Sequence, residues 1–184
     1  VNTGQSSCSD ADAGSYVAST GQSSQTACLA GTYQADMGQA DCDDADAGSY
    51  VDQTGQSSQI ACGVGTYQAL TGQSDCDEAE AGYYVDSTSG TPQISQTACL
   101  AGTYQVNTGQ SSCSDADAGS YVAGTGQSSQ TACLAGTYNP NTGSTASTDC
   151  VGADAGHYVD LALGAGQPSQ TACLAGTYQV NTGQ

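Results

Sequence analysis

The tripeptide Gly-x-Tyr recurs ten times along the chain and divides it into short modules of about 17 or about 20 residues. Two kinds of module alternate. An acidic kind reads like "CSDADAGSYVASTGQSSQTA" and a plain kind like "CLAGTYQADMGQAD", so the full repeat covers about 34 to 37 residues. Self-similarity of this kind is typical of repeat arrays, in which each module mainly contacts its neighbours. The sequence therefore predicts an elongated tandem array.

We expect residues 1–184 to form one continuous array. The pentapeptide "VNTGQ" stands at both ends of the sequence, which favours the interpretation that these residues are a window on a longer chain. The expected modules are 14–30, 31–47, 48–64, 65–81, 82–101, 102–118, 119–135, 136–155, 156–175 and, in part, 176–184.

Secondary structure is predicted to be all-β. Stretches such as "TYQV" at 103–106 and "SYVA" at 120–123 are typical of brief strands, and no helical periodicity is sustained, so we expect no helices. Insertions fall between a tyrosine and the next cysteine position, around a Thr-Gly-Gln segment. These insertions, at 87–95, 139–148 and 161–169, predict an exposed turn that tolerates changes in length.

The composition requires a source of stability other than an apolar core. Leu, Ile, Val and Phe make up about a tenth of the chain, which carries a formal charge of -18 and has no Lys or Arg. Chains of this kind normally stay disordered. The ten regularly spaced cysteines predict a disulfide framework, which favours an extracellular location. Structural zinc is the competing use of cysteine, but the chain has no C-x-x-C pair and one histidine.

The pattern C-x-x-G-x-Y resembles the cysteine-rich repeats of ephrin-receptor-like and TNF-receptor-like ectodomains. In that family two cysteines precede each Gly-x-Tyr: one closes the preceding module and the other opens the next. By this resemblance the opening cysteines are Cys28, Cys62, Cys99, Cys133 and Cys173. The closing cysteines are Cys8, Cys42, Cys76, Cys113 and Cys150. The present chain departs from the family in having one cysteine, not two, before each Gly-x-Tyr.

In the acidic modules both halves of the corresponding bond are missing. The opening positions hold Ala11, Ala45, Ala79, Ala116 and Ala153. The closing positions hold Gln25, Gln59, Gln96, Gln130 and Gln170. The resemblance therefore implies the pairs Cys28–Cys42, Cys62–Cys76, Cys99–Cys113 and Cys133–Cys150.

On this scheme Cys8 and Cys173 find partners outside the window or in a neighbouring subunit. A rival scheme pairs Cys8 with Cys28 and continues along the chain. Loop-closure entropy does not separate the two schemes, because either loop contributes about 3 kcal/mol.

The segment "DADAG" supplies the one candidate metal site. Carboxylates at alternate positions before a glycine resemble part of a calcium loop, and the candidates are Asp10, Asp12, Asp44, Asp46, Asp115 and Asp117. The glycine falls one place early for such a loop, which favours a solvated acidic face with diffuse cation condensation. We therefore expect no resident cofactor, with calcium as the weaker alternative.

Several classes of partner and activity are disfavoured. Without Lys or Arg the chain lacks the groups that bind nucleic acid or anionic membrane surfaces, and no apolar run is long enough for a membrane span. His157 is expected to be exposed, and one histidine with no cationic side chain does not form a catalytic set, so we expect no enzyme. O-linked glycans on turns such as Thr54, Ser57 and Ser58 are a hypothesis.

These features predict an extracellular structural protein, a rod or filament of the kind found in surface appendages, stalks or fibres. Its partners would be further copies of the same chain, with assembly burying Tyr and Val faces. The alternative is the stalk of a ligand-binding or adhesin ectodomain, whose distinctive module would lie at 139–165, or a stalk stiffened by calcium.

Overall fold

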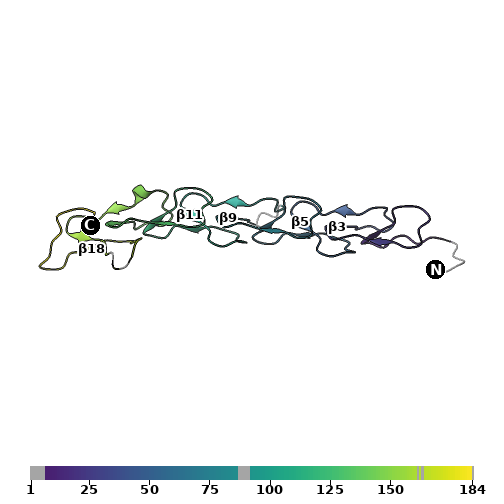
Figure 1. The fold of residues 1–184 in the computed structure, drawn as a ribbon, viewed down its shortest axis with the longest axis horizontal. Coiled ribbons are helices and arrows are strands. Elements are labelled where there is room, and N and C mark those ends of the chain that lie inside the picture. The colour runs from purple at the N-terminus through teal and green to yellow at the C-terminus, as the bar shows by residue number, and fades with distance from the viewer. Residues whose placement is uncertain (1–6, 87–91, 161, 163, 184) are drawn as a thin grey trace. The chain divides into compact units, whose positions relative to one another are not determined.

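The computed structural model describes residues 7–86, 92–160, 162 and 164–183, which form two compact units. Unit 1 comprises Val1–Glu78 and Val85–Gln96, and unit 2 comprises Ala79–Tyr84 and Thr97–Gln184. Within each unit, short hairpins follow one another along the chain (Figure 1).

Every sheet among the described residues is an antiparallel hairpin of two two-residue strands. Unit 1 holds β1 (Ser15–Tyr16) with β2 (Thr26–Ala27), β3 (Thr32–Tyr33) with β4 (Asp43–Asp44), β5 (Ser49–Tyr50) with β6 (Ile60–Ala61), and β7 (Thr66–Tyr67) with β8 (Asp77–Glu78). Unit 2 holds β9 (Tyr83–Tyr84) with β10 (Thr97–Ala98), β11 (Thr103–Tyr104) with β12 (Ser114–Asp115), β13 (Ser120–Tyr121) with β14 (Thr131–Ala132), β15 (Thr137–Tyr138) with β16 (Val151–Gly152), and β17 (His157–Tyr158) with β18 (Thr171–Ala172).

The all-β prediction is confirmed. The expected strands at 103–106 and 120–123 contain β11 and β13, although each strand spans only the two residues that end in tyrosine. No α-helix occurs in the described part of the chain; a three-residue 3-10 helix, η2 (Ser147–Asp149), lies at the end of the second insertion. Strands this short are not stable alone, so contacts between modules must hold them.

For these contacts a module begins at its opening residue, three places before Gly-x-Tyr, so that Cys28 opens a plain module and Ala45 opens the next, acidic one. Three backbone hydrogen bonds join one module to the next. Gly31 donates its N–H to the Val51 carbonyl at 2.7 Å, and Gln34 donates to the Gln56 carbonyl at 3.1 Å. In the reverse direction, Gly55 donates to the Cys28 carbonyl at 2.8 Å. Equivalent bonds recur between other consecutive modules in both compact units, so each turn is bonded to the start of the module before it.

Several modules also contact the module after the next one. Gly31 has φ +88°, and a Cβ at this position would overlap the carbonyl group of Gly72, two modules further on. In unit 2, a Cβ on Gly102 would overlap the Gly143 carbonyl in the same way. Because this contact skips one module, plain modules lie against plain modules and acidic modules against acidic ones. The contact thus brings together modules of the same kind in the alternating sequence.

The core is made of small side chains. Its apolar members are mainly opening-position residues and the valines that follow Gly-x-Tyr: Ala11, Cys28, Ala45, Val51, Cys62, Ala79, Val85, Cys99, Ala116, Val122, Cys133, Ala153 and Val159. The tyrosines of the hairpins from β1 to β16 are half-buried, as expected for packing between modules. The expected exposed Val face is wrong for Val51, Val85, Val122 and Val159, which lie inside the array.

In plain modules a polar side chain takes the place of that valine. Gln34 is buried, donates its amide N–H to the Asp41 carbonyl at 2.9 Å and accepts from the Asp36 N–H at 3.0 Å. Gln68 makes the equivalent bonds to Asp75 and Leu70. A buried amide is tolerated here because both ends are hydrogen-bonded across the turn.

The Thr-Gly-Gln turns contain glycines in the left-handed region, including Gly21, Gly55 and Gly72, and Gly38 of the Met-Gly-Gln turn is in the same region. They are not merely exposed loops, because their backbones make the contacts with preceding modules described above. Part of the first insertion, 87–91, and residues 161 and 163 of the third lie outside the described residues.

Candidate functional site

The plain hairpins of both units are fastened by disulfides. The four bonds join Cys28 to Cys42, Cys62 to Cys76, Cys99 to Cys113, and Cys133 to Cys150. The Cα atoms of each pair lie 5.7–5.9 Å apart. In each pair the opening cysteine is buried and the closing cysteine is half-buried. These are the same pairs that the family resemblance implies, and they differ from the rival scheme.

Cys8 and Cys173 are not bonded to another described residue. Cys8 is exposed and Cys173 is half-buried. The expectation that they find partners outside the window or in a neighbouring subunit stays a prediction.

The acidic hairpins are fastened by a pair of hydrogen bonds at the same place. Gln25 occupies the closing position, and its Oε1 accepts from the Asp12 backbone N–H at 2.7 Å. Its Nε2 donates to the Asp12 carboxylate, also at 2.7 Å. Gln59 with Asp46, Gln130 with Asp117 and Gln170 with Asp154 repeat both bonds. We call this arrangement the Gln–Asp clamp.

The clamp was missed by the sequence analysis, which treated these glutamines only as the residues at lost cysteine positions. A signal was present: wherever the opening position holds Ala, the next residue is Asp or Glu and the closing position is Gln. A carboxylate can accept from a glutamine amide, and glutamine can return an acceptor to the adjacent backbone N–H. Asp or Glu after the opening alanine, together with Gln at the closing position, is therefore the sequence signal for the hydrogen-bonded clamp.

The calcium candidates fall into two groups. Asp12, Asp46 and Asp117 are the carboxylates of clamps. Asp10, Asp44 and Asp115 instead lie beside the turn glycines of the following plain modules; the Asp10 carboxylate carbon is 3.4 Å from where a Cβ on Gly38 would stand. No cluster of three or more metal-ligating side chains occurs among the described residues.

His157 lies in β17 and is half-buried, so the expectation of an exposed histidine is wrong. Its Nδ1 is buried without a hydrogen-bond partner in the described structure.

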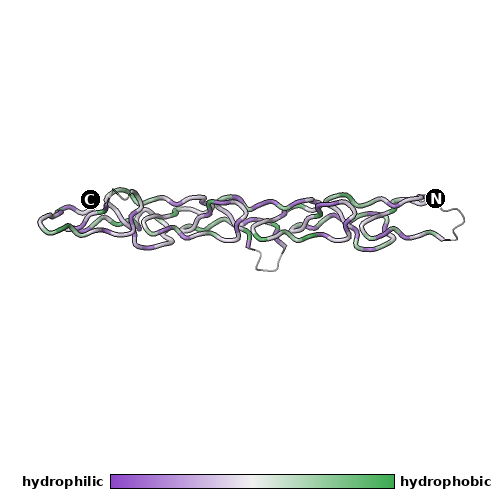
Figure 2. The backbone as a smooth tube through the Cα atoms, turned by 90° about the horizontal axis from the view of Figure 1, so that it is seen from below, coloured by the Kyte–Doolittle hydropathy of each residue, from purple (hydrophilic) through white to green (hydrophobic). Residues whose placement is uncertain are grey.

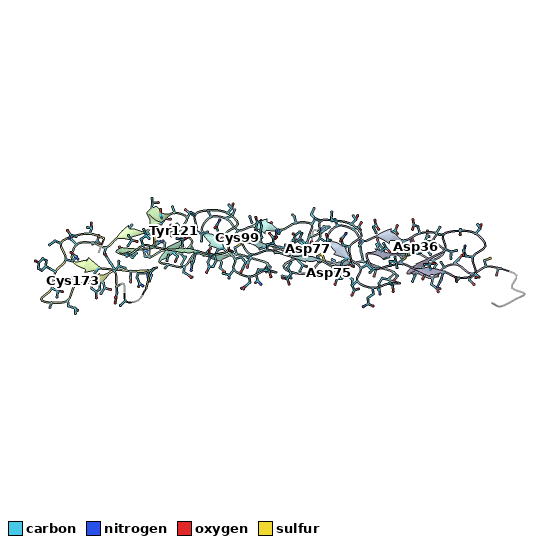
Figure 3. All side chains as sticks on the ribbon, in the orientation of Figure 1. Asp36, Asp75, Asp77, Cys99, Tyr121 and Cys173 are labelled. Carbon is cyan, nitrogen blue, oxygen red and sulfur yellow. A yellow bond between two sulfur atoms is a disulfide. The ribbon has the colours of Figure 1, made fainter. Side chains whose placement is uncertain are left out.

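Side chains elsewhere project outward along each unit (Figure 3). None of the described residues forms a helix long and apolar enough to cross a membrane. Comparison with protein-family models finds no match to this chain, and comparison with curated proteins also finds none.

The geometry identifies a cysteine-rich array of repeated β modules. Disulfides persist in oxidising compartments, and frameworks of this density are typical of secreted proteins and ectodomains. The chain is accordingly of the extracellular structural or ectodomain type. Its most regular structural feature is the series of disulfides and Gln–Asp clamps, which recur from module to module.

Proposed function

We propose that this protein is an extracellular structural element that forms a rod or filament, as in a surface appendage, stalk or fibre, and that it is not an enzyme. One observation carries this proposal: a covalent fastener closes four plain modules, and a hydrogen-bonded one recurs at the same position in four acidic modules. Such a chain resists stretching locally, because each small loop is closed independently of the others.

The free energies that disulfides contribute to folding support this role. A disulfide that closes a loop of about 15 residues contributes roughly 3 kcal/mol, so four contribute about 12 kcal/mol. That is comparable with the whole stability of an ordinary domain, at about 5–15 kcal/mol. The core, made of Ala, Cys and Val, could not match it, because small side chains bury little apolar surface.

The charge of the chain suits an exposed fibre. A formal charge of -18 keeps the chain soluble, and the absence of Lys and Arg removes the cleavage sites of trypsin-like proteases. Self-assembly and O-glycans on exposed turns belong to the same proposal.

A binding or adhesin ectodomain is the alternative, and the insertion at 139–148 favours it. Asn139 is fully buried and donates its side-chain N–H groups to the Ser120 carbonyl and, at 2.8 Å, to the Ser144 hydroxyl. The Asp149 carboxylate accepts from the N–H groups of Thr145 and Ala146, each at 3.0 Å. A loop held this way is preorganised, as recognition loops often are.

Single-molecule stretching tests the structural role. We expect the 14-residue loops to stay closed under load and each to add about 40–45 Å of length once a reductant is present, since the bonded Cα atoms already lie 5.8–5.9 Å apart. Extension of these loops without reductant would contradict the proposal. Electron microscopy of native material completes the test: filaments support the structural role, whereas dispersed short particles support the ectodomain alternative.

A further inference from the structure

The plain modules expose large apolar side chains next to their fasteners. Leu29, Leu100, Leu134 and Leu174 each follow an opening cysteine and are 70–81% exposed. Val64, two residues after Cys62, is 64% exposed. At the position that follows the opening residue, the acidic modules carry a carboxylate: Asp12, Asp46, Glu80, Asp117 and Asp154. The two kinds of module thus differ in surface chemistry at equivalent places.

The loops after tyrosine repeat this difference. Plain modules expose Met37, Leu70, Val106 and Val180 there. Two residues after tyrosine, three of the acidic modules instead hold Ala18, Asp52 and Ala123. We call the exposed apolar side chains of the plain modules the plain row: Leu29, Met37, Val64 and Leu70 in unit 1, and Leu100, Val106, Leu134, Leu174 and Val180 in unit 2.

Stacking places these side chains at a regular interval within each unit. Plain modules lie against plain modules through Gly31 and Gly72 in unit 1, and through Gly102 and Gly143 in unit 2. The plain row therefore presents an apolar group once per full repeat. Apolar stretches recur between hydrophilic ones along the backbone (Figure 2). Singly exposed apolar residues are ordinary on a protein surface, but here Leu or Val recurs beside the opening cysteine of each plain module.

We propose that the plain row is a lateral contact between two copies of this chain. The inference rests on the proposed structural function and names the surface through which assembly occurs. Two observations identify the partner as a second copy. A matching partner must present apolar groups at the same interval, and the same chain does so in both units. The chain also has no Lys or Arg, so contact through the acidic modules would oppose carboxylates without compensation.

The contact is expected to be cooperative along the row. Burying one leucine raises the association constant about ten- to a hundredfold at most, which does not offset the loss of translational freedom on association. Several modules in register act as one multivalent contact. Association is therefore weak for one module and measurable for the full chain.

Sedimentation equilibrium of the 184-residue chain tests the proposal. We expect reversible self-association that strengthens at least about tenfold between about 0.01 M and about 1 M salt, because salt screens repulsion between the acidic chains and leaves the apolar contact intact. We repeat the measurements with a calcium salt in place of the sodium salt, and stronger association with calcium would indicate that cations bridge the chains.

Matched variants locate the contact. The double variant Leu100→Asp/Leu134→Asp introduces the residue that acidic modules carry at that position, and we expect it to weaken association at least about a hundredfold. The control Ala18→Asp/Ala123→Asp adds the same charge at positions where another acidic module has Asp52, and we expect less than about a twofold change. Circular dichroism and a thiol assay verify that both variants keep the fold and its four disulfides.

Three results would overturn the proposal: a monomer at every salt concentration, association that depends on calcium, or equal weakening by the two variants. None of these would remove the closed loops measured by stretching. A failed lateral contact is therefore distinguishable from a failed structural function.

Discussion

Glycine at the start of Gly-x-Tyr performs two tasks that no other residue can combine. At Gly31 the backbone is in the left-handed region, with φ +88°, and the missing Cβ leaves room for the carbonyl of Gly72. Gly21 shares the first requirement, with φ +77°, but a Cβ there would meet nothing within 4 Å. Comparing substitutions at Gly31 and Gly21 therefore separates the cost of backbone strain from the cost of overlap with a neighbouring carbonyl.

We expect Gly31→Ala to destabilise the array by about 2–5 kcal/mol, because strain and overlap add. Gly21→Ala should cost only about 1–2 kcal/mol, since strain alone applies. Denaturation followed by circular dichroism, with hydrogen exchange of the Gly55 and Gly72 amides, measures both. Equal losses in the two variants would show that the carbonyl contact contributes nothing.

At the same scale the clamp shows where sequence reasoning stopped. Gln59 could be recognised as the residue at a lost cysteine position, but its bonds to Asp46 depend on the hairpin bringing residues 13 positions apart together. Whether these two hydrogen bonds form depends on the distance and orientation of the side chains across the hairpin, which residue types alone do not reveal. Exposure limits its value to about 1 kcal/mol for each bond.

At the level of the hairpin, disulfide and clamp are alternative closures of one backbone. The opening residue donates to the glycine carbonyl of the preceding module in both kinds, from Ala45 to Gly31 at 2.8 Å and from Cys62 to Gly48 at 2.9 Å. The strand registers also correspond, with Ser49 opposite Ala61 and Thr66 opposite Glu78. The backbone around a clamp is thus already shaped for a disulfide.

We expect the double variant Ala45→Cys/Gln59→Cys to form a fifth disulfide without change of fold. The bond closes a loop as long as the native ones and contributes about 3 kcal/mol. Losing the clamp bonds costs about 1–2 kcal/mol, which leaves a net gain of about 1–2 kcal/mol. Peptide mapping under non-reducing conditions detects the bond, and denaturation measures the gain. Each single variant should only destabilise; a double variant with two free thiols would show that the two closures are not equivalent.

At the scale of the whole molecule, stability is a sum of module closures and contacts between neighbours. Within each unit, modules are bonded to the next one and several also touch the one after it, so cooperativity spreads over a few modules rather than over the chain. The small core cannot compensate when the closures are removed.

We expect reduction of the four disulfides to abolish folding at physiological temperature, since each bond in a small secreted module is worth about 2–5 kcal/mol. A chelator should leave the melting temperature unchanged, because three of the candidate aspartates are occupied in clamps. Thermal melts followed by circular dichroism, run with reductant, chelator or neither, give the comparison. A melt lowered by chelator alone would establish the calcium-stiffened alternative.

The sequence by itself determined the all-β class and, through its resemblance, the partners of Cys28, Cys62, Cys99 and Cys133, because these depend on residues close together in the chain. Only the tertiary structure decided that alternate modules stack on one another, because that contact is made by backbone groups, Gly31 against Gly72, which every residue type shares. It also decided that the valines after Gly-x-Tyr, such as Val51 and Val122, lie inside, whereas the leucines after the opening cysteines lie outside. Local pattern cannot distinguish the two when strands are two residues long.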